Sequence, residues 1–156
     1  MNIAKAHDFC ARLPGATREL KWAFADSVHP VFSVGAKMFA MFTLRQDRLI
    51  DELMFKADDA RFLELTDRDG FSPAPHLARA MWVKVDGVQR LADTEAKVLL
   101  TEAHHVVMAK LSKKMQQAIR GRWPMRGAID RASVEAHRAP VMAARSTRMS
   151  VRASRR

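Results

Sequence analysis

The pattern of apolar and polar positions in the first 117 residues predicts short helices and strands. Apolar residues recur at helical spacing from Ile3 to Leu13, and Asn2 is placed to cap this helix before Pro14-Gly15 ends it. Between residues 19 and 56 the pattern changes to short apolar runs separated by turn-forming residues, which is typical of strands. Four consecutive and mostly antiparallel strands are expected at Leu20–Phe24, Val31–Val34, Met38–Leu44 and Leu49–Phe55.

The following segment predicts a short helix, a fifth strand and a long helix that closes the body. Asp58-Asp59 places negative charge in the first turn of the short helix, and Asp93 is a suitable N-cap for the long one. The apolar stripe of the long helix runs from Ala96 to Met115. The expected bounds are Asp58–Thr66 for the short helix and Ala80–Val85 for the strand, with a proline-rich loop at Ser72–His76 between them. This order predicts an α+β fold in which a five-stranded antiparallel sheet packs against helices.

Charge divides the chain into a nearly neutral body and a basic tail. Residues 118–156 contain ten arginines and two acids, Asp130 and Glu135, which gives a formal charge of +8 against +2 for residues 1–117. The tail has no leucine and its one aromatic residue is Trp123, so we expect a domain at 1–117 and a flexible, poorly ordered tail at 118–156. Concentrated positive charge favours a polyanionic partner, because neutralised phosphates release their counterions.

The sequence lacks the signatures of secreted, membrane and catalytic proteins. Cys10 is the single cysteine, so we expect no intrachain disulfide and a cytoplasmic protein. The first residues show no long apolar stretch and no run of about 18 apolar residues occurs, so we expect neither secretion nor a membrane span. His104 and His105 are neighbours that point about 100° apart on a helix, unlike an i, i+4 metal pair. Because no nucleophile elbow, phosphate loop or dinucleotide fingerprint occurs, we expect a non-enzymatic protein without metal or cofactor.

A set of short motifs runs in order through residues 5–115. The motifs are Leu13-Pro14-Gly15 with Thr17, Lys21-Trp22, Val31-Phe32 to Val34-Gly35, Lys37-Met38-Phe39-Ala40, Phe55-Lys56, Pro73-Ala74-Pro75-His76-Leu77, Trp82-Val83, and Leu111 with Lys113-Lys114. In this order they resemble the MmcQ/YjbR family of small bacterial proteins. The sequence departs from the family pattern at Ser112, where the family usually has proline. The resemblance implies a curled antiparallel sheet backed by helices, a double-wing shape and DNA binding.

Five basic residues in or beside the expected strands are the first candidates for phosphate contacts. They are Lys21, Lys37, Lys56, Arg79 and Lys84. Lysines at strand ends also discourage edge-to-edge aggregation, so a solvated sheet edge is the alternative interpretation. Phosphate contact is favoured only if these side chains converge on one side of the fold.

A second basic stretch joins the end of the long helix to the tail. Its members are Lys110, Lys113, Lys114, Arg120, Arg122 and Arg126. The three lysines are expected in the last turns of the long helix, where the helix dipole also favours cations. Trp123 lies within this stretch, where it can stack on an unpaired base or anchor the tail on the body as an apolar side chain.

The proline-rich loop and the strand after it hold two further candidates, His76 and Trp82. His76 is the one polar side chain between Pro75 and Leu77. We expect it to lock the loop by hydrogen bonding, with ligand contact by the loop as the alternative.

These observations predict a DNA-binding protein that attaches electrostatically and with low sequence specificity. A protein-interaction or chaperone-like module and a small-ligand-binding accessory protein are the alternatives. Convergent basic residues favour DNA, a large exposed apolar patch favours a protein partner, and a deep polar pocket beside the proline loop favours a small ligand.

Overall fold

The computed structural model describes residues 1–122, and the rest of the chain lies outside the described residues. Its elements confirm the α+β fold with four α-helices, but the sheet has six strands rather than five, in the order β1-β2-β3-β4-β6-β5. Every pair of neighbouring strands is antiparallel. The elements are α1 (Ile3–Ala11), β1 (Ala16–Phe24), β2 (Ser27–Val34), β3 (Lys37–Arg45), β4 (Arg48–Lys56), α2 (Asp59–Thr66), β5 (Phe71–Pro73), η1 (Ala78–Ala80), β6 (Trp82–Asp86), η2 (Val88–Arg90), α3 (Asp93–Met108) and α4 (Lys113–Arg122).

The first two helices begin where the sequence predicts, because their caps satisfy backbone donors. The Asn2 side chain accepts a hydrogen bond from the Lys5 backbone N–H at 2.8 Å. The Asp58 side chain does the same for the Arg61 N–H at 2.8 Å. Cys10, on the inner side of α1, is fully buried, and this burial raises the pKa of its thiol.

The first four strands are longer than expected, the strand expected at Ala80–Val85 begins only at Trp82 because Ala80 ends η1, and one strand was missed. β2 begins at Ser27 and includes His29-Pro30, ahead of the start expected at Val31. β5 has three residues and ends at Pro73, so neither length nor alternation identifies it. Its position explains why proline is tolerated, since β5 is the edge strand of the described sheet and pairs there with β6.

The expected long helix is in fact two helices. α3 ends at Met108, and α4 starts at Lys113 after a short connection that contains Leu111. The N-cap of α3 is Ala92 rather than Asp93, which lies in the first turn instead. Because α4 runs to Arg122, the domain boundary expected after residue 117 falls inside a helix.

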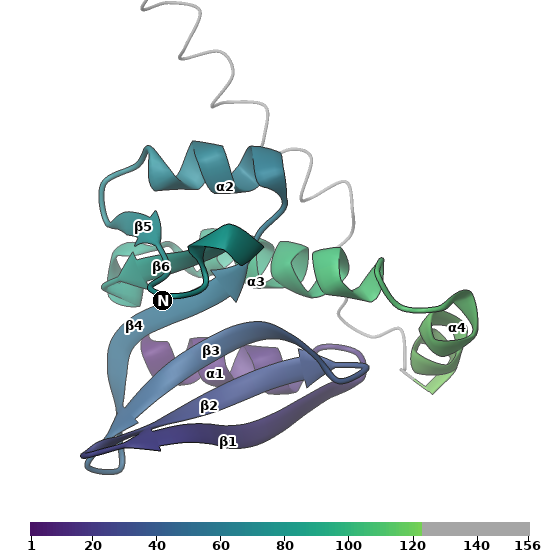
Figure 1. Ribbon diagram of the computed structural model, residues 1–156, viewed down its shortest axis with the longest axis horizontal. Helices are drawn as coiled ribbons and strands as arrows, with labels where there is room; N and C mark the ends of the chain where they lie inside the picture. Colours follow the sequence, from purple (N-terminus) through teal and green to yellow (C-terminus); the bar gives the residue numbers. More distant parts are fainter. Residues whose placement is uncertain (123–156) are drawn as a thin grey trace, which may run out of the picture. The chain divides into compact units, whose positions relative to one another are not determined.

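The main core fills the space between α1, α2, α3 and one face of the sheet, which we call the helix face. Figure 1 shows α1 behind β2 and β3, so the opposite face of these strands is turned toward the viewer. The largest fully buried side chains of the core are Phe32, Phe39, Phe42, Leu53, Phe55, Leu65, Leu99 and Leu100. They come from the central strands and from α2 and α3, so these elements are fixed relative to one another by apolar burial.

The opposite face, which we call the loop face, is covered by a loop rather than by helices. A smaller apolar cluster joins Val31, Met41 and Trp82 of the sheet to Ala74 of the loop between β5 and β6. Leu77 of the same loop packs against this cluster. The loop therefore shields the apolar residues that strand alternation places on this side.

His104 connects α3 to the turn between α1 and β1. Its side chain is 2% exposed, and the Nε2–H donates to the Pro14 carbonyl oxygen at 2.8 Å. The ring also meets Phe39 edge to face, with 5.3 Å between ring centroids. Burial is the main reason why the pKa of His104 falls to about 4, and the charge of His105 lowers it further, so the ring is neutral at pH 7.

We predict that His104 makes the fold sensitive to mild acid. Its pKa is 6.5 in the unfolded chain and about 4 in the fold, so the unfolded state binds the extra proton between these values. The contribution is fully present above pH 6.5 and is lost as pH falls toward 4, with a total on the order of 3 kcal/mol. In urea unfolding at stepped pH, His104→Gln should show a shallower decline across this window than the parent chain, because glutamine donates but does not titrate. Equal slopes for the two chains would contradict the assignment.

Candidate nucleic-acid interface

The lysines of the strands do not all lie on one face. Register places three of them on the loop face, since Lys21 pairs with His29, Lys56 with Trp82, and Lys84 with Met54. Lys37 comes just before Met38, which packs on the loop face, and the pairing with β2 is irregular at Phe39, between Met38 and Ala40. Alternation then directs Lys37 to the helix side. Arg79 lies in η1, within the loop.

Acidic side chains neutralise two of the three lysines on the loop face. The Lys21 ammonium lies 3.1 Å from a Glu19 carboxylate oxygen. Lys84 lies 3.0 Å from carboxylate oxygens of both Glu52 and Asp86, and hydrogen bonds to Asp86 and then Glu52 raise its pKa. This face carries about as many acids as bases, so it offers little net attraction to a polyanion.

Lys56 is the third lysine of this face, and its surroundings differ. Its ammonium donates to the Ala80 carbonyl oxygen. Desolvation is the main cause that lowers the pKa of Lys56, and the positive charge of Lys110 adds to the effect while Asp59 opposes it. Lys56 is therefore linked electrostatically to the connection between α3 and α4.

A polar network crosses four strands on the loop face, and the sequence analysis did not find it. The Thr43 hydroxyl donates to Glu52 at 2.9 Å and lies 3.4 Å from His29 Nδ1, while Lys84 bonds the other Glu52 oxygen. The members come from β2, β3, β4 and β6 and become neighbours only through strand register. These side chains satisfy one another's hydrogen-bonding groups, so the network is expected to stabilise the pairing of the four strands.

The basic residues of α4 form a different arrangement. α4 carries Lys113, Lys114, Arg120 and Arg122, has no acid in its first turn, and has no fully buried residue. The structure corrects the expected position of the two lysines, which begin α4 rather than end the long helix. The dipole of a helix disfavours cations in its first turn, so helix stability does not explain them there. Ser112 lies before this turn, and its hydroxyl accepts from the Met115 N–H at 3.3 Å.

Two glycine turns position α4. Gly15, between α1 and β1, has φ +67°, and a Cβ there would lie 2.8 Å from the Ile119 side chain. Gly35, in the turn between β2 and β3, has φ +53°, and a Cβ there would lie 2.7 Å from Leu111 and 2.8 Å from Met115. Both turns need a left-handed backbone and a bare α-carbon, so only glycine fits them without strain.

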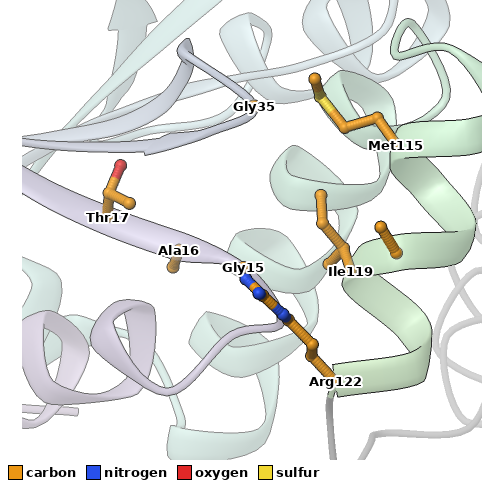
Figure 2. A pocket seen from close by; sticks show the side chains of 8 residues that line it. Gly15, Ala16, Thr17, Gly35, Met115, Ile119 and Arg122 are labelled. Atoms are coloured by element: carbon orange, nitrogen blue, oxygen red, sulfur yellow. The ribbon is translucent and has the colours of Figure 1, made fainter.

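Beside these contacts an apolar groove of about 420 Å³ separates α4 from the sheet. Figure 2 shows Met115 and Ile119 of α4 directed toward the turns at Gly35 and Gly15, with Arg122 extending toward Gly15. Residues at positions 113, 117 and 120 share the other side of a helix with 3.6 residues per turn. α4 therefore turns Met115 and Ile119 toward the domain and Lys113 and Arg120 outward.

The remaining candidates differ from expectation or lie outside the described residues. His76 is exposed, with φ 61°, and among the described residues its side chain has no hydrogen bond. The expected hydrogen-bond lock is therefore not seen among these residues. Backbone bonds from Leu77 to Ala74 and from Ala74 to Trp82 hold the loop instead. Trp82 is 4% exposed and belongs to the loop-face cluster, so a ligand cannot reach it without opening the loop. Trp123 and Arg126 lie outside the described residues.

Comparison with known proteins gives a consistent assignment for the body. The family model YjbR matches residues 11–106. The chain belongs to the YjbR family. No curated protein matches it. A crystal structure of the Deinococcus radiodurans protein DR2400, with the domain DUF419, is similar at a TM-score of 0.62 and 24% identity, covering 79% of this chain and 89% of that one. At this identity the similarity supports the fold alone.

Two of the motifs within the matched residues have a clear structural role. Leu13-Pro14-Gly15 provides the carbonyl that His104 bonds and the turn that Ile119 contacts, and Val34-Gly35 provides the other turn. The match ends at residue 106, so α4 itself lies beyond it. The turns that α4 contacts, at Gly15 and Gly35, lie within the matched residues.

Two classes of site are not found in the part of the chain that the structure describes. Residues 1–122 contain no group of three or more His, Cys, Asp or Glu side chains placed to hold a metal ion. Within the same range, no helix is both long and apolar enough to cross a membrane.

We predict that alanine lowers the stability of the fold at Gly35, in the turn that contacts α4, and raises it at Gly121, within α4. Gly35→Ala should lower the free energy of unfolding by about 2 kcal/mol, because it combines left-handed strain with contact against Leu111 and Met115. Gly121→Ala is the matched control. No atom of the described residues lies within 4 Å of its added methyl, and alanine should stabilise the helix by up to about 1 kcal/mol. Urea unfolding midpoints measure both, and equal losses would show that Gly35 has no special role.

Proposed function

We propose that this protein binds DNA weakly and without sequence preference, through the basic residues around α4 together with the arginine-rich tail. One observation carries the proposal: residues 103–122 contain five cations and no acid. They are Lys110, Lys113, Lys114, Arg120 and Arg122. In contrast, Lys21 and Lys84 on the loop face are paired with carboxylates. The attraction for phosphates is thus concentrated at one end of the domain.

The dimensions of α4 suit contact with a phosphate backbone. Ten residues give a helix about 15 Å long, which spans roughly four phosphates of one strand at 3.4 Å per base pair. Lys113 and Arg120 share its outward side, one near each end. Lys56 lies close enough to Lys110 for the two charges to interact, which extends the basic region onto β4.

The chemistry of these side chains favours attachment over sequence readout. Lysine ammonium groups act as point charges toward phosphate, and phosphate contacts carry no sequence information. Each phosphate neutralised on a duplex contributes about −0.9 to the salt slope, so five contacts give a slope on the order of −4. In this proposal no reaction is catalysed, and the YjbR domain serves as a rigid support for the basic helix.

The proposal predicts that equal changes in net charge have unequal effects on DNA affinity. Lys113→Gln with Lys114→Gln should weaken binding of the full chain to duplex DNA and reduce the magnitude of the salt slope by about 2. Lys21→Gln with Lys84→Gln removes the same charge from the loop face and should leave the slope close to that of the parent chain. Fluorescence anisotropy across a salt series gives both slopes, and far-UV circular dichroism checks the fold.

Two results would contradict this assignment. One is an equal loss of affinity in both double variants, which would indicate a response to net charge alone. The other is a larger loss in the loop-face variant, which would move the interface to the sheet.

A further inference from the structure

The long edge strand β1 has an exposed apolar surface that DNA attachment does not explain. β1 pairs with β2 on one side and, among the described residues, with no strand on the other. Leu20, Trp22 and Phe24 are 56%, 45% and 64% exposed. The opposite edge of the sheet is the three-residue β5, which ends in proline. β1 also carries Arg18, Glu19 and Lys21, and such charges normally discourage edge-to-edge pairing unless the partner strand presents complementary charges. Three exposed apolar side chains on an edge with mixed charge therefore suggest a specific partner strand.

The charge pattern of β1 is complementary to itself in one register. When two copies pair antiparallel about a two-fold axis, a residue at the centre faces its own copy. Centring on Arg18, Glu19 or Lys21 would therefore place like charges opposite each other. Centring on Leu20 places Glu19 opposite the partner's Lys21 twice, and opposite charges in such positions stabilise a sheet.

The same register also matches the side chains on the helix face. Arg18 pairs with Phe32 of β2, which places Arg18 and Leu20 on that face. The central pair is then Leu20 with its own copy, and Arg18 comes opposite the partner's Trp22, where a guanidinium can stack on the indole. Trp22 has φ +50°, and the pairing with β2 is irregular between Lys21 and Phe24. Regular backbone pairing between the copies is therefore confined to Glu19–Lys21 of each copy. Beyond these residues the contact is made by side chains.

We propose that two copies of this chain associate along β1, in antiparallel register about Leu20. The two six-stranded sheets then form one continuous sheet with the helix faces on the same side. A second copy fits better than an unrelated strand because the sequence Arg18-Glu19-Leu20-Lys21-Trp22 supplies both halves of every charged pair. The dimer carries two α4 helices, so it doubles the basic surface without further contacts between the copies.

Charge-reversal variants of the full chain test the register directly. In sedimentation velocity experiments over a concentration series, the parent chain should shift from monomer to dimer. Glu19→Lys alone and Lys21→Glu alone each place like charges opposite each other twice, so each should raise the dissociation constant by roughly tenfold or more. An equimolar mixture of the two variants restores both opposite-charge pairs and should associate more tightly than either variant alone.

The mixing step separates association from folding. Glu19 and Lys21 also form an ion pair within one chain, and each single variant breaks it. Since both partners in the mixture lack that internal pair, only pairing between chains can restore association. Leu20→Lys places two cations at the centre and should abolish the dimer, with unchanged circular dichroism as the check on folding. A parent chain that stays monomeric, or a mixture no tighter than its components, would overturn the proposal.

Discussion

The close approach of two glycine turns to α4 and to the connection before it is the constraint on which the arrangement of the described domain depends. Gly15 and Gly35 leave room for Ile119, Leu111 and Met115 because neither glycine has a Cβ atom. The turn at Gly15 is itself fixed, since His104 of α3 bonds the Pro14 carbonyl. The sheet, α1, α3 and α4 thus meet at one point. A side chain added at either glycine would therefore displace α4 without altering any of its basic residues.

The distribution of paired and unpaired charge then separates two surfaces. On the loop face Glu19, Glu52 and Asp86 balance Lys21 and Lys84, and the contacts form a network across the strands. Such short ion pairs stabilise the sheet, but because the opposite charges cancel, they attract a distant phosphate only weakly. α4 has the opposite character, because its cations have no acidic neighbours in sequence from residue 103 to its end at residue 122.

The sequence predicts the elements of this fold well where local signals are strong. Asn2 and Asp58 cap helices as expected, and the apolar stripe identifies α3. The stripe also runs on through Leu111 and Met115, so it conceals the break between α3 and α4, where Leu111 packs into the core without belonging to a helix. β5 is missed because three residues ending in proline carry no periodic signal. Boundaries therefore depend on tertiary contacts that periodicity does not encode.

The candidate site is less predictable, because strand register decides it. The sequence makes Lys84 a candidate for phosphate contact, yet Glu52 lies beside it because β4 pairs with β6. Lys37 was grouped with the other lysines, yet the irregularity at Phe39 turns it to the other side. One extra residue reverses the face of a side chain, and no local pattern announces such a residue. The positive charge of the tail is visible in the sequence. Whether the basic residues of the domain also contribute to DNA attachment depends on which faces they occupy.

The most direct test of this account is the affinity of a chain that ends at Pro124 for duplex DNA, measured beside the full chain over a range of salt concentrations. This end point keeps α4 whole and removes the arginine-rich remainder of the tail. We predict that the shorter chain binds more weakly but still with a salt slope on the order of −4, owing to the cations around α4. Loss of all salt-dependent binding in the shorter chain would contradict the claim, because it would assign DNA attachment to the tail alone.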